Sequence, residues 1–262
     1  MAMMSVLVGL AAVSGLACWW YVTEQRHAHG TELSLAALGR YLIMWSTMMA
    51  AMMLPTVHRT TILYVRAIRD QTPSKAWSVR LGALLFGYLV IWSLIGVPVY
   101  FVNVVVQKVI PNDTHAMAWF TAALLVAGGL FQFSTLKERC LRHCQSPVGF
   151  VAEYMTRTSW DRDLRAGIAH GVTCLGCCTA MVVVLIAVGT MSLPAMIVLG
   201  VIAMIEKTWA RGAAFSRIMG VGLILYAAVI VVNPQWSPAP FGDTGDHAPV
   251  SVGHHHHQNG YG

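Results

Sequence analysis

Three cysteines close together in an apolar stretch are the residues of this chain best suited to bind a metal. Cys174, Cys177 and Cys178 follow one another at i, i+3 and i+4, so on a helix they share one face. Met181 lies one turn after them and His170 one turn before. His170 is either a ligand or a buried imidazole that is hydrogen-bonded to a neighbouring helix. Thiolate, thioether and imidazole suit Cu(I) or Zn(II) rather than Mg or Ca. The sequence therefore predicts a soft-metal site, for Cu(I) in preference to zinc.

A run of methionines forms a second group of sulfur ligands. Met44, Met48 and Met52 stack at i, i+4 and i+8, and Met49 and Met53 flank them. Methionine is common in apolar helices as flexible filler, so this stripe is either core or part of a metal path. Its density next to a thiol cluster keeps both interpretations open.

A second cysteine pair follows the fourth apolar stretch of the chain. Cys140, His143 and Cys144 again occupy i, i+3 and i+4, provided that one helix contains all three. The pair is either incidental or the point where a metal enters from the cytoplasm. The reducing cytoplasm argues against a disulfide between the two thiols.

Helices in lipid must position these residues. Hydrophobic residues make up 56% of the 262-residue chain and charged residues only 11%. A transmembrane helix needs roughly 20 apolar residues, so we expect an all-α, polytopic membrane protein with about seven transmembrane helices. Six full spans plus one short or re-entrant element is the alternative, because the sixth stretch is short and contains Pro194. The expected spans are 3–22, 35–57, 81–106, 116–134, 167–188, 191–205 and 213–232.

The distribution of basic residues predicts an orientation. The segments after the second, fourth and sixth spans hold most of the 17 Lys and Arg residues, so the positive-inside rule places them in the cytoplasm and the C-terminal tail outside. The net charge of +6 then reflects topology, and we expect the lipid bilayer, not nucleic acid, as a partner. In this orientation the cysteine and methionine groups lie in the inner half of the membrane, with Cys174 about 10 Å deep.

The chain is expected to form one domain with a tail. Residues 1–232 form a single transmembrane domain in this interpretation, and the Pro/Gly-rich tail 233–262 is expected to be disordered. Four consecutive histidines at 254–257 either bind metal weakly or are incidental.

Nothing in the sequence favours an enzyme. It has no Ser/His/Asp set, phosphate loop or paired intramembrane carboxylates. Glu206 and Lys207 are expected to form an interfacial ion pair, with proton relay by Glu206 as the alternative.

Several blocks of the chain resemble one bacterial family. Residues 44–55, 136–147, 170–178 and 206–207 are similar to the signature blocks of predicted metal-binding integral membrane proteins, long treated as a domain of unknown function. The resemblance covers about residues 35–207. It implies a bacterial inner membrane location and copper handling, since a member of the family is associated with copper supply to a tyrosinase-type oxidase and relatives are described as copper chaperones.

Together these observations predict a membrane chaperone that holds Cu(I) and helps to metallate a copper oxidase or oxygenase. Thiolates hold Cu(I) tightly and thioethers hold it weakly, so a change from cysteine to methionine ligands permits capture and release. Two alternatives stay open. One is a non-catalytic accessory subunit of a copper-dependent membrane monooxygenase. The other is an intramembrane thiol-disulfide oxidoreductase that uses Cys174 and Cys177 as a redox pair, which would need accessible thiols.

Overall fold

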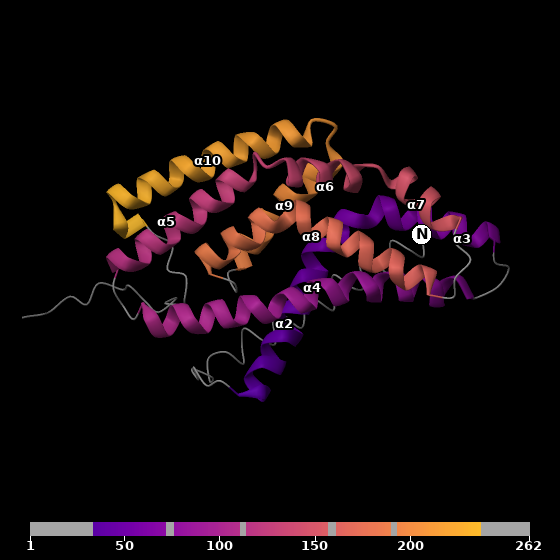
Figure 1. The fold of residues 1–262 in the computed structure, drawn as a ribbon, viewed down its shortest axis with the longest axis horizontal. Helices are drawn as coiled ribbons and strands as arrows, with labels where there is room; N and C mark the ends of the chain where they lie inside the picture. Colours follow the sequence, from indigo (N-terminus) through magenta and orange to yellow (C-terminus); the bar gives the residue numbers. More distant parts are fainter. Residues whose placement is uncertain (1–33, 72–75, 111–113, 157–160, 190–192, 237–262) are drawn as a thin grey trace, which may run out of the picture.

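The computed structural model describes residues 34–71, 76–110, 114–156, 161–189 and 193–236, and every regular element in these ranges is a helix (Figure 1). The predicted all-α class is therefore confirmed for the described residues. Two short 3-10 turns, Pro55–Val57 and Pro234–Trp236, accompany the α-helices. The α-helices are α2 (Leu35–Met53), α3 (His58–Gln71), α4 (Ala76–Val109), α5 (Thr114–Phe131), α6 (Thr135–Gln145), α7 (Pro147–Met155), α8 (Arg162–Val188), α9 (Leu193–Thr208) and α10 (Gly212–Val232).

Within the described residues, four helical segments are long and apolar enough to cross a membrane: Leu35–Arg69, Ala76–Val109, Arg162–Val188 and Gly212–Val232. A fifth is added if α5 and α6, which meet at an angle of 62°, form one broken span. The predicted count of seven is not confirmed. The first expected span, 3–22, lies outside the described residues, and α9 has only 16 residues, fewer than the roughly 20 that a span needs.

The segment after the second predicted span is a helix rather than the expected loop. Pro55 begins a 3-10 turn, where its missing N–H removes no helical hydrogen bond, so the chain continues into α3. Arg66 and Arg69 lie exposed on this helix. Helices α6 and α7 likewise occupy much of the segment after the fourth predicted span.

Helix α8 is the centre of the structure and packs against α4, α5, α6 and α9 (Figure 1). Glycines allow the close approach of α4 and α8. A Cβ atom at Gly167 would lie 2.0 Å from the carbonyl oxygen of Leu84, and one at Gly87 would lie 2.5 Å from that of Leu164. Small residues commonly bring transmembrane helices together in this way, so backbone contact fixes the helix that carries the three cysteines.

A buried ion pair fixes α6 against α9. Ser134 starts α6 by accepting a hydrogen bond from the Leu136 N–H, and the helix then turns Lys137 inward. Lys137 Nζ lies 3.0 Å from a carboxylate oxygen of Glu206, and both side chains are almost fully buried. Gln145 donates a second bond to the Glu206 backbone carbonyl at 2.8 Å. Glu206 therefore pairs with Lys137, and the expected interfacial pair with its sequence neighbour is wrong.

Candidate metal centre

The three cysteines of α8 form a compact, buried cluster of sulfur atoms. The Sγ atoms of Cys174, Cys177 and Cys178 all lie within 4.8 Å of one another. Each residue is no more than 1% exposed. Thiolates that share one ion at about 2.3 Å stand roughly 4 Å apart, so only small side-chain adjustments separate this cluster from a three-sulfur metal site. Helical spacing alone produces the convergence, because i, i+3 and i+4 fall on one face.

The pair on α6 lies beside this cluster, so the two cysteine groups of the sequence meet in space. Cys144 Sγ is 3.8 Å from Cys177 Sγ. Cys140 faces the same helix, since a Cβ atom at Gly176 would lie 2.6 Å from its Sγ. Both α6 cysteines are only partly buried, unlike the three on α8. A metal ion could therefore meet the more exposed thiols first and then pass to the buried ones by exchange of sulfur ligands.

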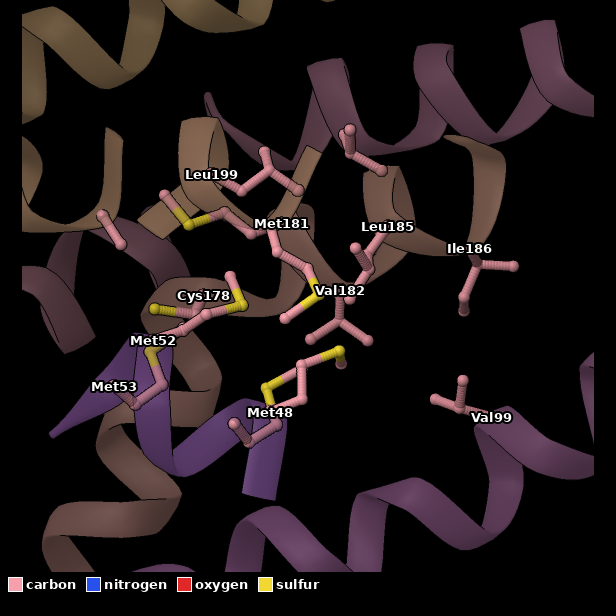
Figure 2. Close-up of a cluster of buried hydrophobic side chains, with 14 of the residues drawn as sticks. Met48, Met52, Met53, Val99, Cys178, Met181, Val182, Leu185, Ile186 and Leu199 are labelled. Carbon is pink, nitrogen blue, oxygen red and sulfur yellow. The ribbon is translucent and has the colours of Figure 1, made fainter. Parts of the chain in front are cut away.

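Methionines of α2 reach the cluster from another helix. Four of them belong to the same buried cluster as the three cysteines and Met181: Met48, Met49, Met52 and Met53. Figure 2 shows Met48 and Met52 extending from α2 toward Cys178 and Met181 of α8. Met44, the first residue of the predicted stripe, is buried as well but lies outside this cluster. Thioethers therefore continue the set of sulfur donors beyond the thiols.

His170 packs against aromatic side chains. Its ring centroid is 5.0 Å from that of Phe150 and 5.8 Å from that of Tyr88, and the three side chains line one small pocket. Neither ring nitrogen has a hydrogen-bond partner within the described residues. The alternative of a hydrogen bond to a neighbouring helix is therefore wrong here, and a role as ligand stays a prediction.

The surroundings of Cys174 contain two polar groups that the sequence interpretation missed. Lys207 Nζ donates to Cys174 Sγ at 3.0 Å, and the Tyr88 hydroxyl lies 3.1 Å from the same sulfur. Lys207 also donates to Thr56 Oγ1 at 3.1 Å, and Met53 Sδ is 3.9 Å away. The available signal was the lysine itself, since a charged residue at the end of an apolar helix of a membrane protein is a functional candidate by default.

The remaining sequence candidates lie outside the described residues. They are Cys18, interpreted as a buried small hydrophobic residue, and the histidines at 254–257. The tail beyond residue 236 and the orientation of the chain in the membrane therefore stay predictions.

A family model described as "PpoB2: Copper chaperone" matches residues 42–230, which is well over half of the chain. The chain therefore belongs to this copper chaperone family, and the resemblance stated from the sequence is confirmed. The matched segment contains all three groups of sulfur ligands, and the buried cysteine cluster fits copper binding. Comparisons with curated proteins and with solved structures return no match.

Proposed function

We propose that this copper chaperone family member holds Cu(I) at Cys174, Cys177 and Cys178 and delivers it to a copper-dependent oxidase or oxygenase. The observation that carries the proposal is the convergence of three buried sulfurs within 4.8 Å of one another. Family membership makes copper the expected cargo. Soft thiolate ligands select Cu(I), and zinc is the less favoured cargo.

The proposed path begins at the partly buried thiols of α6. Cu(I) bound by Cys140 and Cys144 passes to Cys177, whose sulfur is 3.8 Å from that of Cys144. Because this separation is close to that of two sulfurs sharing one ion, the metal can gain a ligand on α8 before it loses one on α6. It therefore does not have to leave its sulfur ligands at this step.

The methionines of α2 provide the release end of the path. Met52 and Met48 adjoin the buried thiols (Figure 2). Met44 lies one turn before Met48 on the same helix. A thioether binds Cu(I) without losing a proton and holds it less tightly than a thiolate. The sequence of ligands thus favours capture at the cysteines and release beyond the methionines, with His170 as an additional ligand near the thiols.

The protein is proposed to work in the bacterial inner membrane as one transmembrane domain, residues 1–232. In the orientation predicted by the positive-inside rule, α6 faces the cytoplasm and the tail 233–262 lies outside. The burial of the α8 thiols disfavours the oxidoreductase alternative, because dithiol exchange requires accessible sulfurs. Stoichiometric co-purification with an oxygenase would instead identify an accessory subunit.

Metal analysis of anaerobically purified protein tests the proposal. The reduced wild-type protein should retain about one Cu(I) against a weak chelator, and simultaneous change of Cys174, Cys177 and Cys178 to Ser should abolish retention because a hydroxyl is a poor ligand for Cu(I). Cys18→Ser is the matched control and should retain copper. Unchanged retention in the triple variant would refute the site.

A further inference from the structure

Lys207 is a buried cation whose closest anionic candidate is a thiol of the proposed copper site. The side chain comes from the last turn of α9, and the residue is 7% exposed. Its ammonium donates to Cys174 Sγ at 3.0 Å and to Thr56 Oγ1 at 3.1 Å. Within the described residues no carboxylate pairs with it, because Glu206 is held by Lys137. The sulfur is therefore the group that can balance its charge.

The sulfur of Cys174 is within hydrogen-bond distance of two polar groups, the ammonium of Lys207 and the hydroxyl of Tyr88. Burial of an unpaired ammonium is expensive, and it becomes tolerable when an anion and hydrogen-bond acceptors are present. Cys174 Sγ also lies 3.1 Å from the Tyr88 hydroxyl. The sulfurs of Cys177 and Cys178 lie beside other sulfurs, and the Cys177 thiol also donates to the backbone carbonyl of Cys174 at 3.1 Å. Cys174 is thus the cysteine of the cluster whose sulfur accepts a hydrogen bond from a buried ammonium.

Charge balance connects this arrangement to the cargo. Two thiolates carry two negative charges, and a bound Cu(I) ion contributes one positive charge, so a copper bis-thiolate has a net charge of minus one. An isolated charge of this kind is costly in a buried, sulfur-rich environment. An ammonium 3.0 Å from one of the sulfurs brings the group to neutrality.

We propose that Lys207 is the counter-ion of the copper site and that its ammonium stabilises a Cu(I) bis-thiolate in which Cys174 and either Cys177 or Cys178 bind the ion as thiolates, while the third cysteine of the cluster stays a neutral thiol. The inference rests on the proposed function. It assigns to Lys207 the role of a positioning residue that sets how tightly the cargo is held, without itself being a ligand. In a variant without this ammonium, a neutral complex of Cu(I) contains only one thiolate, and its other ligands are neutral thioethers.

The test compares Cu(I) binding by full-length Lys207→Met and Lys207→Arg with that of the wild type, by anaerobic competition with bicinchoninate. Loss of a charged hydrogen bond predicts a ten- to hundredfold weaker affinity for Lys207→Met, roughly what such bonds contribute. Lys207→Arg keeps the positive charge and should stay within about threefold of the wild type. The double variant K137M/E206Q is the matched control, because it removes another buried ammonium together with its partner and leaves the thiols untouched.

A second measurement counts the thiolates directly. The metal-free and copper-loaded proteins are alkylated under the same conditions and compared by mass spectrometry, so that protection by burial is subtracted. Protection that depends on copper should cover two of the three α8 thiols in the wild type and in Lys207→Arg, and one in Lys207→Met. Circular dichroism and thermal unfolding in detergent show whether each variant is folded. If the wild type binds copper and folded Lys207→Met has the same affinity and the same protected thiols, the inference is overturned. It is also overturned if Lys207→Arg and Lys207→Met lose the same amount of copper affinity. Absence of Cu(I) binding in the wild type would instead overturn the proposed function.

Discussion

Lys137 and Lys207 are both buried, and their partners differ in kind. Lys137 pairs with the carboxylate of Glu206 at 3.0 Å, whereas Lys207 donates to the sulfur of Cys174 at 3.0 Å. The first pair joins α6 to α9, so it acts within the scaffold. The second joins α9 to the face of α8 that offers sulfur ligands. Adjacent residues of α9, Glu206 and Lys207, therefore contact different groups, because they point about 100° apart around the helix.

The partners also respond differently when a lysine is lost. A carboxylate without its lysine remains a buried charge or must take up a proton at a cost, whereas a lone thiol is uncharged at neutral pH. The carboxylate pair should thus dominate stability, and the thiol pair should dominate metal affinity. Substitutions at each pair test this difference.

The largest effect on stability is expected at the scaffold pair. Lys137→Met leaves Glu206 buried without its partner and should lower the free energy of unfolding by about 3–5 kcal/mol, as in other broken buried pairs. Thermal unfolding in detergent measures the loss. The double variant K137M/E206Q should recover most of it, because neither charge is then left unpaired. An equally large loss in Lys207→Met would contradict the proposed division between the two lysines.

A smaller effect should separate the cysteines from one another. Cys174→Ala removes the sulfur that faces both Lys207 and Tyr88, so two buried donors lose an acceptor. We expect it to destabilise the protein by roughly 1–3 kcal/mol more than Cys178→Ala, because the sulfur of Cys178 lies beside the sulfur of Cys177. Thermal unfolding of the metal-free proteins measures the difference. Equal destabilisation would show that Lys207 and Tyr88 are satisfied elsewhere.

Local rules explain how much of this arrangement the sequence could predict. Hydropathy predicted the helical class, and helical spacing predicted that Cys174, Cys177 and Cys178 share a face, since both depend on residues near one another in the chain. The position of α6 beside α8 depends on contacts such as Lys137 with Glu206, which join residues far apart in the sequence. The spacing of apolar residues along the chain does not predict a contact between residues so far apart in the sequence.

The direction of Lys207 was beyond the sequence for the same reason. A helical wheel separates Glu206 from Lys207 but does not say which of them faces the thiols. The count of seven spans is not confirmed, because the first expected span lies outside the described residues and α9 has only 16 residues. Apolar length does not reveal whether a helix such as α9 crosses the bilayer or stops inside the protein.

The smallest effect on stability and the clearest effect on function are expected for the methionines of α2. Replacement of Met44, Met48 and Met52 by Leu roughly conserves volume and should cost less than about 1.5 kcal/mol per site. The triple variant should therefore remain folded and still hold Cu(I) at the thiols. Because leucine offers no lone pair to copper, transfer beyond the thiols should fail, and the recipient enzyme should accumulate without copper.

Activity of the recipient oxidase or oxygenase at limiting and at excess copper measures this failure. Delivery should fail at low copper and recover at high copper, since mass action can bypass a chaperone but cannot replace a structural subunit. Met155→Leu makes the same chemical change in α7, outside the sulfur cluster, and should deliver copper normally. Full recipient activity at limiting copper in the triple variant would mean that the methionines are packing residues. The contrast between the two lysines would then stand, but the path of copper would have to leave the thiols in another direction.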